Sequence, residues 1–241
     1  MPPVMTVPRA DRVLRPEIMD GPLPYGEARR ALRDLDRVNR WTLGLGALLR
    51  CLIPRLGRRG TTVRLLDVGT GTGYGAHRLA RAAARRGIRL RTVGVDRRLA
   101  HLVVGRELHA ETGLRHRVVA SADALPFRAG AFHWTCSHLL FHHFDGRANR
   151  KIIEEMLRCA RRGVAVIDLR RSVWAAFLAR LLFPLLRIGH VAAEDGVLSI
   201  RQSWTVEEIH HLARESHWPV TELRNRFPFR WSLVLSHEEA P

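Results

Sequence analysis

Apolar positions recur along the chain with two different periods. Over residues 25–53 they recur at helical spacing, with Gly44 and Gly46 as candidate break points. From 63 to 169, short apolar runs alternate with amphipathic segments that each end at a glycine, which is typical of strands followed by helices. This alternation predicts a doubly wound, mostly parallel α/β sheet. The predicted strands are 63–68, 90–96, 115–120, 131–140 and 164–169, and the predicted helices are 74–87, 97–113 and 147–163.

The pattern changes after the fifth predicted strand. We expect an apolar helix over 172–188, interrupted at Pro184, and then a loop over 189–203. Thr205 and Glu208 have the spacing of a capping box, which predicts a further helix. Apolar and polar residues alternate in two later segments, which predicts antiparallel strands that close one edge of the sheet. These segments are 219–227 and 229–237.

This pattern suggests how the chain is organised. Residues 1–24 are rich in proline and are expected to be extended. We expect residues 1–60 to form an N-terminal extension and helical cap, and residues 61–241 to form the main domain. The main domain would contain an apolar helical insertion at about 172–200.

Composition restricts the partners and the compartment. The net charge is +17, but only one of the 40 basic residues is lysine, and the arginines are spread over several predicted helix faces. We therefore do not expect nucleic acid as a partner. Three distant cysteines predict neither a disulfide framework nor a zinc site. No signal-like start and no run of eighteen apolar residues are present, so we expect a cytoplasmic protein.

A glycine-rich turn follows the first strand in the stretch "LLDVGTGTGYG". Glycines allow positive φ angles and a close approach of the backbone to a ligand. A dinucleotide site would require GxGxxG/A, yet Tyr74 stands where that fingerprint requires glycine or alanine. The lysine of a phosphate-binding P-loop is also missing, because neither GKS nor GKT occurs. The turn therefore indicates a nucleotide site of another kind.

Three acidic residues narrow the ligand. Asp67 precedes the turn, where it would repel a pyrophosphate but suit an ammonium group. Asp96 ends the second strand, where an acid can accept both ribose hydroxyls. Asp123 follows the third strand, where it could meet an adenine amine. An amino acid, a ribose and an adenine without phosphate describe S-adenosyl-L-methionine.

The segments "LLDVGTGTGYG", "VGVDRRL", "ADALPF" and "FHWTCSHLLFHHF" resemble, in order and spacing, the class I S-adenosylmethionine-dependent methyltransferases. The resemblance covers about residues 62–170 and implies a Rossmann-like seven-stranded sheet with an antiparallel last strand. The alternatives are a turn that binds NAD and a turn that binds nothing. By the resemblance, the expected cofactor contacts are Asp67, Gly69, Thr70, Gly71, Gly73, Asp96 (ribose), Arg97 (over the adenine), Ala122 and Asp123 (adenine edge), and Ser137.

A weaker resemblance concerns the acceptor. "PEIMD", "LRDLDRVNRW", the "HHF" after the fourth strand and "IDLRRS" are similar to bacterial methyltransferases associated with polyketide and phenolic-lipid pathways. This similarity implies secondary metabolism and a small phenolic, quinol-like or polyketide-derived acceptor, methylated on a hydroxyl. The expected product of the cofactor is S-adenosyl-L-homocysteine.

The catalytic residues should follow strands four and five, because ligands bind beyond the carboxyl ends of parallel strands. We expect His142 or His143 to be the general base, the alternative being that they cap or pack under the loop. We expect no metal, because carboxylates at ligand spacing are missing near the pair. Arg170 could neutralise a substrate anion or form a local ion pair. The expected pocket residues are His138, Asp168, Arg170, Trp174, Phe177, Asn39 and Trp41.

Several alternatives stay open at this point. The apolar helix could be a lid over an apolar acceptor, a purely structural helix, or a less favoured membrane-surface contact. An RNA or protein methyltransferase is a second function, although "CSHL" stands where base-methylating enzymes carry Asn/Asp-Pro-Pro-Tyr/Phe. A non-catalytic cofactor-binding subunit is a third. We expect a monomer or a homodimer.

Overall fold

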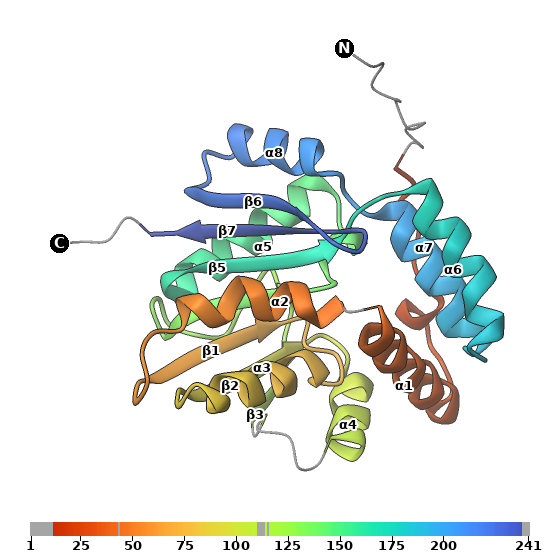
Figure 1. Ribbon diagram of the computed structural model, residues 1–241, viewed down its shortest axis with the longest axis horizontal. Helices are drawn as coiled ribbons and strands as arrows, with labels where there is room; N and C mark the ends of the chain where they lie inside the picture. Colours follow the sequence, from red (N-terminus) through yellow and green to blue (C-terminus); the bar gives the residue numbers. More distant parts are fainter. Residues whose placement is uncertain (1–11, 43, 110–113, 115, 238–241) are drawn as a thin grey trace.

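The computed structural model describes residues 12–42, 44–109, 114 and 116–237, and its strands form one sheet (Figure 1). The strands are β1 (Thr62–Val68), β2 (Arg89–Asp96), β3 (His116–Val119), β4 (Phe132–His138), β5 (Ala160–Leu169), β6 (Val220–Arg226) and β7 (Arg230–Ser236). Their order is β3-β2-β1-β4-β5-β7-β6. β1 pairs in parallel with β2 and β4, whereas β7 is antiparallel to β5 and β6. The predicted Rossmann-like sheet with an antiparallel last strand is confirmed.

The helices lie on both faces of this sheet and at one end of it. They are α1 (Tyr25–Trp41), α2 (Gly44–Leu52), α3 (Tyr74–Arg85), α4 (Leu99–Leu108), α5 (Gly146–Cys159), α6 (Val173–Leu185), α7 (His190–Gln202) and α8 (Val206–Glu215). Short 3-10 helices are η1 (Ile18–Asp20), η2 (Ile53–Arg55) and η3 (Phe141–His143). Leu65 of β1 packs in the core beneath α2 and α3, and its neighbour Leu66 packs in the core beneath α5 and α8. β1 is therefore apolar throughout its middle, because a central parallel strand is covered on both faces.

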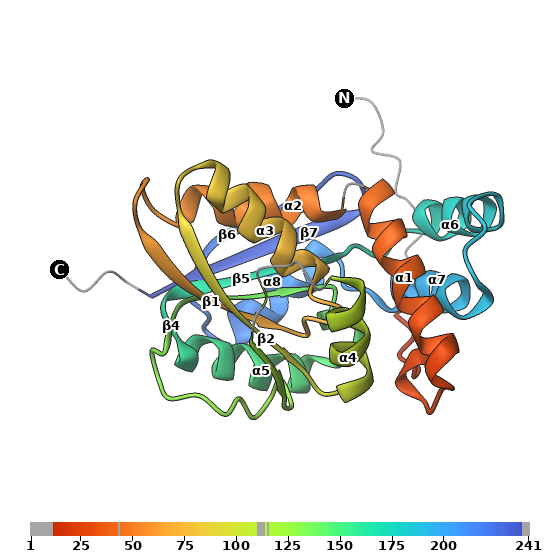
Figure 2. The ribbon, with the colours of Figure 1, turned by 90° about the horizontal axis from the view of Figure 1, so that it is seen from below.

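Three helices from distant parts of the chain form a cap. Figures 1 and 2 show α1, α6 and α7 side by side beyond the end of the sheet. Leu32 of α1, Phe183 of α6 and Val197 of α7 belong to one buried cluster. In contrast, α2 packs with α3 on a face of the sheet. The proposed unit 1–60 thus contributes one helix to the cap and one to the main body.

The fifth strand begins earlier than the sequence predicts. The expected helix over 147–163 ends at Cys159, and Ala160 already belongs to β5. Gly163 was expected to end that helix, but it lies inside the strand, paired with Ser236 of β7. A Cβ atom here would lie 2.2 Å from the carbonyl oxygen of Leu235. The glycine is therefore needed for close strand contact.

The expected loop over 189–203 is wrong, because His190–Gln202 form α7. Tertiary contacts stabilise this helix. Gly196 packs closely against the ring of Phe183, and the buried carboxylate of Asp195 accepts hydrogen bonds from the backbone of Ile18 and Met19. Two glycines and several polar residues hide the helical period, because the partners of this helix come from elsewhere in the chain.

Other local predictions hold. Thr205 and Glu208 form the expected capping box at the start of α8. The helical region 25–53 is divided between α1 and α2, next to the expected break at Gly44. The predicted extended segment 1–24 and helix 97–113 lie partly outside the described residues.

Candidate active site

A cavity of about 600 Å³ lies between the sheet and the cap. The cavity lies beside β1. One neighbour of β1 in the sheet is β2, which follows it directly in the chain, and the other is β4, which comes later, so the loops that leave these strands diverge. Ligands of open α/β sheets bind at such a point. The wall includes Gly69 and Asp96 from the sheet side and Trp41, Leu178 and Leu182 from the cap.

The glycine turn forms the floor of this cavity. The backbone N–H groups of Gly69 and Thr70 donate to the carbonyl of Val95, at 2.8 and 2.9 Å. Gly71 has φ +54°, and a Cβ built on it would meet no described atom within 4 Å. At Gly69 the same atom would lie 2.8 Å from the side chain of Leu140. The turn is therefore tightly packed at its start and open to the cavity at Gly71.

Asp96 lies beside the turn and is held in place. Its carboxylate accepts hydrogen bonds from the backbone N–H groups of Gly71 and Arg98, at 3.0 and 2.9 Å. Arg97 also lines the cavity, and its guanidinium forms an ion pair with Asp20 at 2.8 Å. Ala122 lies on the same wall. The structure thus brings Asp96, Arg97 and Ala122, three of the residues predicted to bind ribose and adenine, to one cavity.

Four of the predicted cofactor contacts do not line the cavity. Asp67 is buried beneath the turn, where it accepts a hydrogen bond of 2.6 Å from the hydroxyl of Thr70. Burial raises the pKa of Asp67 to about 6. Gly73 begins α3, Ser137 is fully buried inside the sheet, and Asp123 contacts Ser121 and Lys151 on the surface.

The predicted histidine pair lies on η3, at the cavity wall. His142 is buried, and its Nδ1 is 2.7 Å from a carboxylate oxygen of Asp168. The other Asp168 oxygen accepts from the backbone N–H of His142 at 3.1 Å. Asp168 does not line the cavity itself, so it positions His142. Burial opposes ionisation of Asp168, but the charge and hydrogen bond of His142 lower its pKa.

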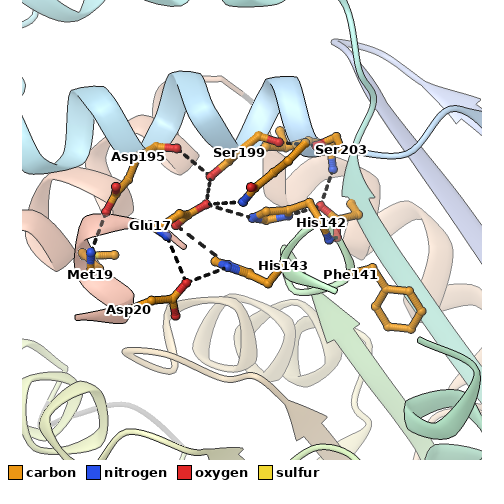
Figure 3. Close-up of polar contacts among 12 residues, drawn as sticks. Glu17, Met19, Asp20, Phe141, His142, His143, Asp195, Ser199 and Ser203 are labelled. Carbon is orange, nitrogen blue, oxygen red and sulfur yellow. Dashed lines mark hydrogen bonds and ion pairs between the residues drawn. The ribbon is translucent and has the colours of Figure 1, made fainter. Parts of the chain in front are cut away.

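Sequence reasoning missed an acid that faces both histidines. Figure 3 shows Glu17, from the N-terminal segment, beside the two rings with its carboxylate facing both. Its carboxylate oxygens lie 3.7 Å from Nε2 of His142 and 3.9 Å from Nε2 of His143. Nδ1 of His143 lies 3.4 Å from Asp20. Burial raises the pKa of Glu17 to about 7. Carboxylates therefore do lie around the two histidines in the folded chain. The reason for expecting no metal, that such carboxylates are missing, is wrong.

Only part of the predicted acceptor pocket is assembled. Asn39, Trp41 and His138 line the cavity. Arg170 instead donates a hydrogen bond to the side-chain amide oxygen of Asn225 in β6, which is a local contact but not the ion pair that was the alternative. Trp174 and Phe177 are 62% and 57% exposed and lie outside the cavity wall. From the same helix, Leu178 and Leu182 line it instead.

Arg230, at the start of β7, is a second residue that the sequence did not reveal. It lines the cavity and is only 4% exposed, and burial lowers its pKa to about 10. Its guanidinium donates to the carbonyl of Pro228 and to the hydroxyl of Thr42, and its Nε has no hydrogen-bond partner among the described residues. Nε2 of His138 is likewise buried and unpartnered within the described chain. The cavity therefore offers two unsatisfied nitrogen groups.

The outer face of α6 is strongly apolar, with Trp174, Phe177, Leu181 and Leu185 each more than half exposed. The helix has 13 residues. Across the residues that the structure describes, no helix has both the length and the apolar character needed to span a bilayer.

Comparison with solved structures establishes the class of fold. A methyltransferase from Aquifex aeolicus, described as SAM-dependent, is 16% identical, with a TM-score of 0.59 over 89% of this chain and 99% of its own. The PH0226 protein from Pyrococcus horikoshii is 16% identical, with a TM-score of 0.58 over 84% and 91%. A methyltransferase in complex with the Trm112 activator of Haloferax volcanii is 16% identical, with a TM-score of 0.60 over 88% and 96%. The protein thus has the Rossmann-like fold of these enzymes.

A family model matches the central part of the chain. Residues 65–163 match the family model described as a methyltransferase domain. The comparison with curated proteins gave no match. The matched segment runs from β1 into β5 and includes the glycine turn and Asp96, and S-adenosyl-L-methionine is the cofactor that similarity to a methyltransferase domain implies.

Proposed function

We propose that the protein methylates a hydroxyl oxygen of a small phenolic, quinol-like or polyketide-derived acceptor. The observation that carries this proposal is the single cavity that joins the glycine turn to the apolar cap. An acceptor held under α1, α6 and α7 would be covered by the cap, which favours a small molecule over RNA or protein. Such cover would also limit access of water to the reacting atoms.

The cofactor half of the cavity fits S-adenosyl-L-methionine. The open position at Gly71 leaves room for a ligand against the backbone, and the fixed carboxylate of Asp96 can accept two ribose hydroxyls. Ala122 would contact the adenine. When bound, the cofactor supplies an electrophilic methyl group, whose carbon–sulfur bond breaks as the acceptor oxygen forms its new bond to carbon. The turn and Asp96 position that group and need not change its chemistry.

The acceptor half combines an apolar wall with polar anchors. Trp41, Leu178 and Leu182 offer apolar surface for an aromatic or lipid-like body. His138 and Arg230 offer unsatisfied nitrogens, and a buried guanidinium that has no carboxylate partner among the described residues favours a ligand that carries an oxygen anion or an acceptor oxygen. An apolar molecule with one or two oxygen groups matches both features.

The histidine pair would accept the proton of the acceptor hydroxyl. Asp168 fixes the ring of His142 through Nδ1, so its Nε2 is the free base. His143 has the more exposed side chain of the two and lies on the cavity wall. The proton lost by the hydroxyl remains on an imidazole, and the acceptor oxygen then bonds to the methyl carbon.

Binding of the cofactor can be tested separately from catalysis. S-adenosyl-L-homocysteine should raise the melting temperature of the wild-type protein, and Asp96→Ala should abolish this shift, whereas NAD should cause none. A shift caused by NAD would contradict the cofactor assignment.

The acceptor is tested with phenols and quinols of increasing apolar size. We expect Arg230→Gln to raise KM for acceptors at least tenfold, because a buried polar contact is lost. S-adenosyl-L-homocysteine should stabilise this variant as it does the wild type. In the double variant His142→Ala/His143→Ala, turnover at saturating acceptor should fall by about 10²–10⁴-fold. Unchanged turnover across the pH range would disprove the role of the pair as base.

A further inference from the structure

The geometry around Glu17 has the features of a cation site. The structure places Nε2 of His142, Nε2 of His143 and the Glu17 carboxylate so that one ligand atom from each lies within 4.8 Å of the other two (Figure 3). The donors come from the N-terminal segment and from η3, which are remote in sequence. Two imidazoles and one carboxylate, with a position left open, form a ligand set that catalytic zinc sites use.

Each imidazole has a second carboxylate behind it. Nδ1 of His142 lies 2.7 Å from Asp168, and Nδ1 of His143 lies 3.4 Å from Asp20. Carboxylates of this kind fix the ring orientation of metal-binding histidines and direct the other nitrogen to the metal. Both Nε2 atoms consequently face the same carboxylate.

Glu17 is also held in place. Its Oε1 accepts hydrogen bonds from the hydroxyl of Ser199, at 2.5 Å, and from the amide of Gln202, at 3.0 Å. Its Oε2 is directed toward His143. Both of these donors are neutral, so a bound metal ion would stabilise the ionised form of this buried carboxylate.

We propose that Glu17, His142 and His143 bind one divalent transition-metal ion, with zinc the best match. Imidazole and carboxylate donors suit zinc. Zinc–ligand distances of about 2.0–2.1 Å imply tetrahedral ligand separations of roughly 3.4 Å. The Glu17 oxygens lie 3.7 Å (Oε1 to His142) and 3.9 Å (Oε2 to His143) from the rings, and one ligand atom from each residue lies within 4.8 Å of the others, so the three side chains would have to draw together around the ion. The fourth position would face the cavity, because all three ligands line it.

The proposed metal site would extend the proposed function, but binding of the ion does not depend on that function. A metal-bound hydroxyl loses its proton more readily, so the ion could activate the acceptor in place of a free imidazole. Binding of the ion is a property of the three ligands and stands whether or not the acceptor is correctly assigned.

The test uses the full chain, freed of metal by chelation. We expect Co²⁺ to bind at one equivalent and to give visible absorption bands of four- or five-coordinate cobalt, and Zn²⁺ to displace it. Glu17→Gln and His143→Gln should each weaken Co²⁺ binding at least tenfold. Asp20→Asn should weaken it about tenfold, because it removes an outer carboxylate.

A matched control is available on α8. His211 and Glu215 form an exposed pair at 3.2 Å that resembles one half of the proposed site. His211→Gln should leave Co²⁺ binding unchanged. The same samples are tested with S-adenosyl-L-homocysteine, and a rise in melting temperature shows that the variants are folded. If S-adenosyl-L-homocysteine did not stabilise the wild type, the cofactor site would be contradicted instead of the metal site.

Three results would overturn the proposal. They are the absence of saturable Co²⁺ binding, equal binding by wild type, Glu17→Gln and His143→Gln, and cobalt bands typical of thiolate ligands. The last result would place the ion on Cys51, Cys136 or Cys159, which are free and buried.

Discussion

Asp67 is a buried acid whose ionisation should destabilise the fold. Burial raises its pKa from 3.8 to about 6, so the folded state binds this proton more tightly than the unfolded chain does. Stability is therefore highest below about pH 4 and falls as the pH rises through 6, which is the reverse of an acid in a salt bridge. The cost above pH 6 is up to about 3 kcal/mol, from about 1.4 kcal/mol per pKa unit.

We predict that Asp67→Asn is more stable than the wild type at pH 8, and that the difference disappears below about pH 4. The asparagine can still accept the hydrogen bond from Thr70. Urea unfolding at a series of pH values measures this. Asp123→Asn is the matched control. A hydrogen bond from Ser121 lowers the pKa of that exposed acid, so its ionised form stabilises the fold and the substitution should lower stability at pH 8. A difference for Asp67→Asn that does not vary with pH would contradict the assignment.

The residues that can be predicted from sequence are those whose partners are close in the chain or fixed by a motif. Gly69, Gly71 and Asp96 follow strand ends, so the sheet brings them to one edge whatever the rest of the chain does. Glu17 and Arg230 could not be found in this way. Their partners belong to remote segments, and although Glu17 lies in the stretch "PEIMD", nothing in that stretch indicates that it faces the two histidines.

Gly163 shows how an element boundary can depend on a neighbouring strand. We predict that Gly163→Ala destabilises the protein by roughly 1–3 kcal/mol or more, because the new methyl group would overlap Leu235 of β7 and the ring of Trp134. This corresponds to a fall in melting temperature of about 3–10 °C, which calorimetry measures.

Gly26 provides the contrast. It lies in the first turn of α1, where a Cβ atom would meet nothing within 4 Å. Gly26→Ala should therefore leave stability unchanged or raise it by up to about 1 kcal/mol. If Gly163→Ala melted at the same temperature as Gly26→Ala, the close contact between β5 and β7 would be disproved.

Elements that the sequence predicts well are those with a strong internal period. The apolar runs of β1 and β5 and the amphipathic repeat of α3 can be recognised from their own residues, without knowledge of what they pack against. α7 was missed because its stability comes from contacts with η1 and α6. The helix carries a buried Asp195 whose partners are backbone groups of Ile18 and Met19, and no local pattern indicates them.

At the scale of the whole molecule, the cavity exists because two remote parts of the chain, α1 and the consecutive helices α6 and α7, meet at the same end of the sheet. α1, α6 and α7 form the cap, and the segment from Arg12 to Gly21 joins it to the sheet. Arg12 donates to the carbonyls of Gln202 and Phe144, at 2.7 and 2.6 Å. The doubly wound, mostly parallel sheet could be predicted from alternation alone, but this closure could not, because it depends on contacts between the N-terminal segment and residues more than a hundred positions away.

The attachment of this segment should control access of the acceptor. Asp195 of α7 accepts from the backbone N–H groups of Ile18 and Met19, at 2.7 and 2.9 Å. Hydrogen bonds to a charged group contribute about 1.5–3 kcal/mol each. We predict that Asp195→Ala makes local opening of residues 18–19 easier by about 3 kcal/mol, so their amides exchange roughly a hundredfold faster.

Hydrogen exchange with mass spectrometry measures this change, and acceptor kinetics show its consequence. KM for the acceptor should rise, because Met19 and Asp20 line the cavity, while S-adenosyl-L-homocysteine affinity should change little, because the glycine turn is held by β2. Asp145→Ala is the matched control: that carboxylate also accepts a backbone hydrogen bond, from Ala148, but at the start of α5. Equal exchange of residues 18–19 in both variants would mean that Asp195 does not hold the segment closed. If exchange rises while acceptor KM stays constant, the acceptor enters by another side of the cap.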